Sequence, residues 1–464
     1  MIEKFRSLSF WFTSHSSHED PHSPHRIFKT LVFHIRPRMV AERTLRFTLT
    51  FGLGGMAVVL VTLQIFTGIL LKFAYEPFPV QAYDSLIRLQ TGFPFGQFIR
   101  NIHFWSANFL VGVLFLHGLR VFFTGAFRTP RRVNWIVGLS LFLLVLAANL
   151  TGYLLPWDQL AYWATTICLG MLDYIPGIGN RLQQWVMGGP QLGPATLRNF
   201  FALHTAVLPV IIVALMTYHF WKIRKAGGLV VPKSPEEIPE EKPTMVSSKP
   251  NLLLREAAVA LSAIACVLTV ALLFDAPLGP PANPGLSPNP TKAPWYFAGV
   301  QEMLVHFHPT FALLIVLSLS LGAFFLLPYL GGGAAFPGVW FASAVGRRTS
   351  VAAAIAAGLI TPIAVILDEY VIDLAAWMPG WPQVVSNGLI PTALFIGLLA
   401  GVYIAIRKPF RAPRLETVQA LVIFLVVMFV MLTIICSVFR GEGMKLDSKF
   451  KIRNLKQSES AKNS

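Results

Sequence analysis

Long charge-free apolar runs alternate with short polar segments along most of this chain. Crossing about 30 Å of hydrocarbon takes roughly 20 helical residues. Four runs near this length predict membrane helices at Phe47–Leu71, Asn101–Leu119, Val133–Pro156 and Phe200–Trp221. Five more follow at Ala257–Phe274, Thr310–Leu330, Ser350–Leu367, Leu389–Ile406 and Thr417–Phe439. Because several of the second group are near the short limit, we expect eight or nine transmembrane helices in an all-α, polytopic membrane bundle.

The polar segments between these runs predict the domain organisation. We expect a cytoplasmic arm at 1–46 with room for a surface helix, a four-helix membrane domain at 47–221, a cytoplasmic linker at 222–256, a C-terminal membrane domain at 257–439 and a polar tail at 440–464. The linker is rich in Pro, Glu, Lys and Ser, which is typical of interdomain connections. The prolines between Asp275 and Pro294 preclude a helix or a central strand, so we expect an ordered external loop there. The histidine-rich tract of the arm is compatible with metal binding or with a polar tail.

Composition and charge agree with a membrane protein. Of the 464 residues, 54% are apolar and 13% are charged, whereas a soluble domain carries about 25% charged residues. Lys and Arg outnumber Asp and Glu by 38 to 22, and they gather in the arm and in alternate loops, which predicts a cytoplasmic N terminus and requires no nucleic acid partner. The three cysteines match no CxxC or CxxCH spacing, which argues against disulfide scaffolds, zinc modules and thioether-bound haem.

Two predicted spans of the first domain each contain a pair of histidines. His103 and His117 are 14 residues apart and His204 and His219 are 15 apart, so each pair projects from about one helix face at levels about 21 Å apart. The two spans run in the same direction, which places His103 level with His204 and His117 level with His219. Neutral imidazoles on facing helices suit haem iron, and ionisable residues within a span are functional by default. We therefore predict two bis-histidine haem b sites; histidines hydrogen-bonded in a polar cavity are the alternative.

Glycines repeat the same interval in the other two spans of this domain. Gly54 and Gly68 are 14 residues apart, and so are Gly138 and Gly152. Missing side chains at two levels would let flat macrocycles approach the backbone. Packing of small residues between helices is the alternative, although it does not by itself require equal intervals.

Two arginines flank the histidines of the second predicted span. Arg100 lies three residues before His103, and Arg120 lies three residues after His117. Their guanidinium groups are placed to pair with haem propionates. Anchoring of the helix ends at the membrane surface is the alternative.

Three segments give the chain a resemblance to a known family: RNIHFWSANFLVGVLFLHGLRVFFTGAFRTPR, LTGYLLPWDQLAYWATTI and FFALHTAVLPV. With the histidines and glycines above, they make residues 40–330 resemble the cytochrome b subunit of Rieske/cytochrome b complexes. Asp158 and the 15-residue histidine interval fit the branch of oxygenic phototrophs. In that branch a four-helix haem subunit and a quinol-site subunit are separate chains, which here would be fused through the linker.

The resemblance implies a quinol:cytochrome c or plastocyanin-type oxidoreductase that runs a proton-translocating Q cycle. Quinol would be oxidised near the outer face, with one electron passing to a Rieske iron–sulfur protein and the other, through the two haems, to a quinone at the cytoplasmic side. We expect a c-type cytochrome partner, a homodimeric complex and a location in the bacterial cytoplasmic membrane. The phototroph branch has a cysteine in its first span that attaches an extra haem; Gly52 takes that position here, so we expect no covalent haem.

The expected outer quinol site lacks the family's carboxylate. The usual motif is Pro-Glu-Trp-Tyr, whose glutamate accepts a quinol proton, but this chain reads Ala293-Pro294-Trp295-Tyr296. Glu302 is the nearest alternative base, with His306 one helical turn further on as a relay and His308 close by. Its alternative role is to cap or solvate the start of the sixth span. By resemblance the pocket would be lined by Tyr153, Trp157, Trp295 and Tyr296, and closed by a short helix after Leu160.

Two other function classes account for part of the pattern. A secondary transporter with histidine proton relays would explain the spans but not the repeated glycine interval. A dihaem membrane anchor that links quinone to a peripheral dehydrogenase would keep the haems but leave the proline-rich loop and the Trp-Tyr motif unexplained.

Overall fold

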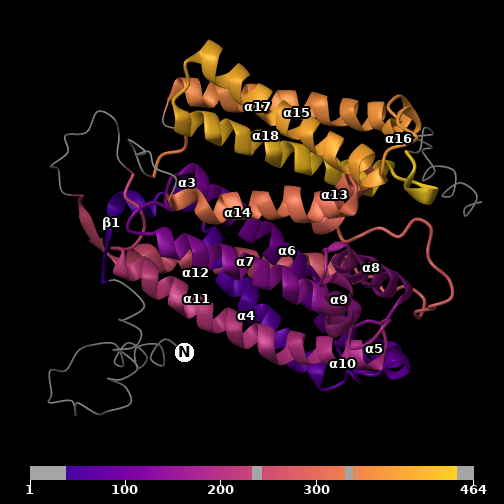
Figure 1. Cartoon of the computed structure of the whole chain (residues 1–464). Coiled ribbons are helices and arrows are strands. Elements are labelled where there is room, and N and C mark those ends of the chain that lie inside the picture. The colour runs from indigo at the N-terminus through magenta and orange to yellow at the C-terminus, as the bar shows by residue number, and fades with distance from the viewer. Residues whose placement is uncertain (1–37, 233–242, 330–337, 342, 447–464) are drawn as a thin grey trace, which may run out of the picture.

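The computed structural model describes residues 38–232, 243–329, 338–341 and 343–446. Helices dominate this part of the chain, and two short strands, β1 (Met39–Ala41) and β2 (Met245–Ser247), pair antiparallel at one end of the molecule (Figure 1). The expected surface helix, the histidine-rich tract and most of the polar tail lie outside the described residues.

Nine helices among the described residues are long and apolar enough to cross a membrane, and each overlaps one predicted span. The first four are Leu53–Lys72 (α4), Gly96–Phe123 (α6), Arg132–Leu154 (α7) and Pro194–Lys225, which joins α10 (Pro194–Ala202) and α11 (Leu208–Lys225). The other five are Ser248–Leu273 (α12), Phe311–Tyr329 with α14 (Ser318–Leu326), Ala344–Tyr370 (α15), Val385–Phe410 with α17 (Ile390–Phe410) and Arg414–Phe439 with α18 (Arg414–Ile434). The all-α, polytopic prediction is confirmed.

Short helices gather at the end of the bundle opposite β1, which we call the α8 end (Figure 1). They are α5 (Pro79–Gly92), α8 (Gln159–Gly170), α9 (Gly179–Met187) and α13 (Trp295–His306). The expected short helix near Leu160 is α8, and the Asp158 carboxylate caps it by accepting a hydrogen bond from the Ala161 N–H at 2.8 Å. The opposite end is called the β1 end below.

Most spans begin a few residues away from the predicted start, and two of these differences have a local cause. The first span begins at Leu53 because Phe51 and Gly52 adopt left-handed conformations that separate it from the short helix α3 (Phe47–Thr50). Helix α12 begins at Ser248, nine residues before the predicted Ala257, so the expected linker ends earlier than residue 256. Arg255 and Glu256 end the charge-free run at Ala257, but the Arg255 guanidinium donates a hydrogen bond to the Leu45 carbonyl at the β1 end, and the helix continues through both residues.

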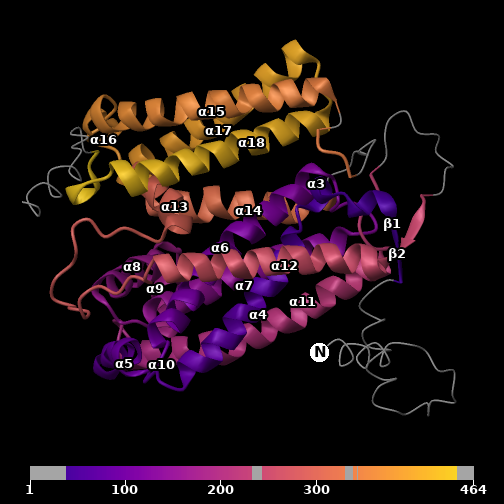
Figure 2. The ribbon, with the colours of Figure 1, turned by 180° about the vertical axis from the view of Figure 1, so that it is seen from behind.

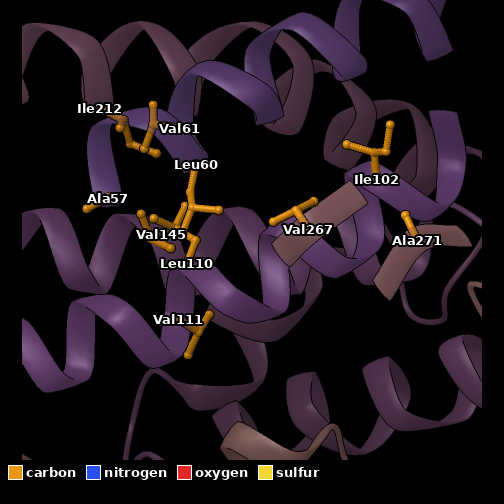
Figure 3. Close-up of a cluster of buried hydrophobic side chains, with 10 residues drawn as sticks. All are labelled: Ala57, Leu60, Val61, Ile102, Leu110, Val111, Val145, Ile212, Val267 and Ala271. Atoms are coloured by element: carbon orange, nitrogen blue, oxygen red, sulfur yellow. The ribbon is translucent and has the colours of Figure 1, made fainter. Parts of the chain in front are cut away.

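Helix α12 packs on the four-helix bundle formed by α4, α6, α7 and α11. Its Val267 and Ala271 are each 1% exposed and lie in one apolar cluster with Leu60 and Leu110 (Figure 3). The first helix of the predicted C-terminal domain therefore contributes to the core of the first bundle.

Helices α15, α17 and α18 form a separate layer, and α13 and α14 lie between this layer and the bundle (Figures 1 and 2). Ala353, Ala357 and Ala420 are buried where α15 meets α18, because small side chains let helix backbones approach closely. At the β1 end the Gln419 amide donates to the Phe123 carbonyl at 3.1 Å, which ties α18 to α6.

Candidate functional site

His103 of α6 and His204 of the α10–α11 helix face each other inside the bundle, near its α8 end. Their ring centroids are 6.1 Å apart and the ring planes are nearly perpendicular, at 80°. Two imidazoles bound through nitrogen on opposite sides of one metal ion need a similar separation, because each metal–nitrogen bond is about 2 Å long. The pair therefore fits a metal between the rings.

Hydrogen bonds at Nδ1 fix the tautomer of both rings. The Thr67 hydroxyl is 2.6 Å from the Leu63 carbonyl oxygen and 2.9 Å from Nδ1 of His103. A hydroxyl has one proton and a carbonyl only accepts, so Thr67 donates to Leu63 and accepts from Nδ1–H. Nδ1 of His204 is 2.9 Å from the Ala148 carbonyl oxygen, which likewise can only accept. In the neutral rings, Nε2 of both histidines is left with a lone pair for a metal.

Two glycines lie directly behind this pair. A methyl group at Gly68 would be 3.3 Å from Cε1 of His103, and one at Gly152 would be 2.5 Å from Cε1 of His204. Non-bonded carbon atoms make favourable contact at about 3.5–4 Å. A side chain at Gly152 would thus displace the His204 ring.

The second pair, His117 and His219, lies near the β1 end and also has a glycine behind each ring. A methyl group at Gly54 would be 3.5 Å from Cε1 of His117, and one at Gly138 would be 3.4 Å from Cε1 of His219. Each glycine therefore faces one histidine, which explains why the two residue types share an interval. The glycines, expected to admit a macrocycle to the backbone, also make room for the histidine rings.

A π-helical turn explains the longer interval in the fourth span. Leu203–Val207 forms this turn between α10 and α11, and it contains His204. Pro209 follows, and because proline has no N–H it cannot donate to the carbonyl four residues earlier. A π turn accommodates one extra residue. The 15-residue interval from His204 to His219 therefore matches the 14-residue interval in α6.

The two flanking arginines bind backbone carbonyls. The Arg100 guanidinium donates to the carbonyls of Ala276 and Pro277 at 2.7 and 2.6 Å, and Arg120 Nε donates to the Leu49 carbonyl at 2.7 Å. Both arginines are buried. Arg100 thus fixes the proline-rich loop against α6, and pairing of these residues with propionates stays a prediction.

Tyr153, at the end of α7, and Tyr296, in the first turn of α13, come together at the α8 end. Burial raises the pKa of the Tyr296 hydroxyl, and the nearby Tyr153 and the Cys168 thiol of α8 raise it further. Burial also raises the pKa of Cys168 to about 11. At neutral pH the cluster offers uncharged hydrogen-bonding groups beside an apolar core, which suits a small ring that carries hydroxyl groups.

Trp295 adjoins this cluster, because its ring centroid is 5.5 Å from that of Tyr296. Trp157 is buried against Tyr162, with ring centroids 5.5 Å apart. Trp295 is 47% exposed, and its Nε1–H donates to the Asn108 side chain of α6 at 2.8 Å. A role for either tryptophan in binding a ring stays a prediction.

Glu302 is fully buried and forms an ion pair with Arg440, which follows α18. Arg440 Nη2 is 2.6 Å from Glu302 Oε1, and His306 Nε2 is 3.2 Å from the same oxygen. Burial raises the pKa of Glu302, but the hydrogen bonds from His306 and Arg440 outweigh burial and lower the pKa below its ordinary value. Glu302 is therefore ionised at neutral pH, and its burial contradicts the alternative in which it solvates the sixth span.

Sequence reasoning missed several residues around these sites. Thr67 orients His103, Cys168 adjoins the tyrosines, and Arg440 and Asp368 contact Glu302 and His306. Thr67 directly precedes Gly68, so the glycine interval marks the segment of the helix in which it lies. Arg440 and Asp368 lie 138 and 62 residues from their partners, and no local pattern marks them.

Residues 41–227 match the family model described as cytochrome b/b6/petB. The chain is 42% identical over 177 residues to cytochrome b6 of Synechococcus sp. (strain JA-3-3Ab), which is 38% of this chain and 82% of that protein. Its identity to cytochrome b6 of Prochlorococcus marinus (strain MIT 9515) is also 42%, over 38% of this chain and 81% of that protein.

A solved structure described as a hyperthermophilic respiratory Complex III resembles the chain over most of its length. The TM-score is 0.63 at 23% sequence identity, and the match covers 89% of this chain and 98% of that one. At this identity the likeness concerns the fold, and it extends beyond the residues shared with the cytochrome b6 proteins.

Proposed function

This chain belongs to the cytochrome b/b6 family and is an electron-transferring cytochrome b subunit of a quinol oxidoreductase, and we propose that its bundle holds two haem b groups. Family membership implies haem b bound without a covalent link. His103 and His204 would hold one haem, and His117 and His219 the other. When bound, haem b supplies one-electron transfer. The observation that carries this proposal is the fixed tautomer of His103 and His204, which presents both Nε2 atoms as ligands.

The chain's own residues prepare these sites. Thr67 and the Ala148 carbonyl orient the rings of one pair, and such contacts to the far ring nitrogen raise the basicity of a metal-bound imidazole. Glycines behind all four rings leave the imidazoles in place within tightly packed helices. Gly52, which takes the position of the haem-attaching cysteine of the phototroph branch, has no thiol, and a methyl group there would be 2.7 Å from Val259. We therefore propose no covalent haem, which haem-stained denaturing gels test.

We place quinol oxidation at the α8 end, beside Tyr153 and Tyr296. Quinol loses two electrons and two protons there; one electron would pass to a Rieske iron–sulfur protein and the other to this chain, in a Q cycle that reduces quinone near the β1 end. The sequence has no iron–sulfur or c-type haem motif, so the Rieske protein and the c-type cytochrome would be separate subunits. With a cytoplasmic N terminus, the α8 end faces outward. We expect a homodimeric complex in the bacterial cytoplasmic membrane.

Single-histidine variants test the two-haem proposal. His103→Ala would remove one of the imidazoles that hold the haem near the α8 end, and His117→Ala would remove one near the β1 end. Each variant should lose about half of the haem b of the purified complex while the chain still inserts, and the two variants should retain haems with different midpoint potentials. Spectra that keep both low-spin haems in His103→Ala would contradict the assignment. Co-purification of a Rieske protein separates this function from a dihaem anchor of a peripheral dehydrogenase.

A further inference from the structure

A buried ionic network joins three separate elements at the α8 end of the C-terminal layer. Glu302 and His306 come from α13, Asp368 from the end of α15, and Arg440 from the segment after α18. Arg440 Nη2 is 2.6 Å from Glu302 Oε1, and His306 Nδ1 is 2.6 Å from Asp368 Oδ2. The Glu302 side chain is fully buried, whereas that of Asp368 is 43% exposed. The network therefore leads from a buried carboxylate to an exposed one.

His306 has a hydrogen-bond partner in both of its protonation states. Its Nε2 is 3.2 Å from Glu302 Oε1 and also 3.2 Å from Arg440 Nη2. A protonated Nε2 donates to the carboxylate, and an unprotonated Nε2 accepts from the guanidinium. Nδ1–H donates to Asp368 in either state. The ring can thus accept a proton at Nε2 while both of its nitrogens stay hydrogen-bonded.

The route ends at a cavity on the surface. This cavity has a volume of about 530 Å³, and His306, His308, Asp368 and Asp373 are among its lining residues. Such a volume holds many water molecules, because one water occupies about 30 Å³ in the liquid. A proton that reaches Asp368 is therefore in contact with solvent.

We propose that Glu302, His306 and Asp368 form the path by which a quinol proton leaves this subunit, with Arg440 as a positioning residue; the proposal rests on the proposed quinol oxidation. The quinol O–H bond breaks and its proton passes to the Glu302 carboxylate, while the two electrons of quinol leave to the iron–sulfur partner and to this chain. Glu302 then protonates Nε2 of His306, the charged ring passes its Nδ1 proton to Asp368 and the cavity water, and a flip of the ring restores the starting arrangement for the next proton. The path accounts for one of the two quinol protons.

The charges around His306 determine the expected pH dependence. The groups that face it are Glu302 on α13, Asp368 and Glu369 on α15, and Arg440; His308 and Asp373 line the same cavity, and Cys436, in the turn after α18, lies near Glu302. Burial lowers the pKa of His306, but the hydrogen bonds to Asp368 and Glu302 outweigh it and raise the pKa above its ordinary value. Because His306 in turn lowers the pKa of Glu302, its removal should raise that pKa. Quinol oxidation would then need a higher pH.

Quinol oxidation by the intact complex, measured from pH 5.5 to 9 together with haem content, tests the route. His306→Gln should slow turnover at pH 7 by about tenfold or more, and move the acid limb of the profile to higher pH. Asp368→Asn should also slow turnover and move the acid limb to higher pH, but by less. Asp373→Asn is the matched control, because it removes a carboxylate from the same cavity but retains the cap of helix α16 (Leu374–Trp377), and it should leave the profile unchanged.

Chemical rescue separates a relay from a structural histidine. Imidazoles of graded pKa, added to His306→Ala, should restore turnover through the cavity in proportion to their basicity. A wild-type pH profile in His306→Gln, with both haems present, would overturn the route and leave the proposed function intact. A loss of turnover that follows loss of haem, and that no imidazole restores, would assign His306 a structural role. Absence of quinol oxidation in the wild-type complex would overturn the proposed function itself.

Discussion

The first bundle and the C-terminal layer place buried polar groups in opposite ways. In the bundle, single histidines stand in apolar helices at fixed intervals, and each one faces a glycine of a neighbouring helix. In the C-terminal layer the interface between α15 and α18 is built on alanines, and Glu302 and Arg440 form a buried ionic network at its α8 end. The bundle places its histidine pairs at two levels along the helices. The ionic network instead leads from the buried Glu302 carboxylate to the exposed Asp368 carboxylate.

The two kinds of site should also respond differently to substitutions. A histidine that faces a glycine needs the space behind its ring, so the loss caused by substituting that glycine should depend on how close the added atom lies to the ring. A buried charge needs its partner, so the loss of stability on substituting one member of the pair should depend on whether the remaining charge is compensated. Three substitutions of decreasing expected effect test this contrast.

Arg440→Gln should have the largest effect on stability. It leaves the fully buried Glu302 carboxylate without its main cation, and breaking a buried ion pair from one side costs about 3–5 kcal/mol. Thermal unfolding of the detergent-solubilised complex should show a clear fall in midpoint. The double variant Glu302→Gln/Arg440→Gln is the control, because it removes both charges together. It should be more stable than the single variant, and equal stability of the two would mean that the pair is not coupled.

Gly152→Ala should have an intermediate effect that is confined to one haem. The added methyl group would lie 2.5 Å from the His204 ring, and overpacking of a dense core costs about 1–3 kcal/mol. We expect reduced occupancy of the haem held by His103 and His204, measured by redox difference spectra. Gly54→Ala is the matched control, because its methyl group would lie 3.5 Å from the His117 ring, in ordinary contact. Equal losses in both variants would show that distance to the ring is not the cause.

The same contrast explains what the sequence could reveal. The histidines and glycines of the bundle are visible because both repeat within single helices. The structure adds that each glycine faces one histidine ring, which the intervals alone did not predict. The π turn at His204 was not visible as such, although Pro209 marks the break in helical hydrogen bonding that accompanies it. The start of α12 was misplaced because a charge count cannot tell that Arg255 finds a backbone partner.

The network of the C-terminal layer could not be predicted in the same way. Glu302 and His306 are one helical turn apart and were recognised together, but their partners come from α15 and from the segment after α18. Only the packing of these three elements brings the charges together. The residue types alone identified Glu302 and His306 as candidates. The tertiary fold determines that Glu302 is buried and ionised, and that His306 and Asp368 connect it to a cavity.

The smallest expected effect is that of Thr67→Val, which keeps the shape of the side chain and removes one hydrogen-bond acceptor. Nδ1–H of His103 then loses its partner, and a single hydrogen bond contributes about 0.5–1.5 kcal/mol, so the haem should remain bound. An imidazole whose far N–H is not hydrogen-bonded is less basic and stabilises oxidised iron less. The midpoint potential of the haem held by His103 and His204 should therefore rise, while that of the other haem stays constant and serves as the internal control. Thr67→Ser retains the acceptor and should restore the wild-type potential in redox titration, whereas a rise of both potentials would mean that the substitution acts on the bundle as a whole.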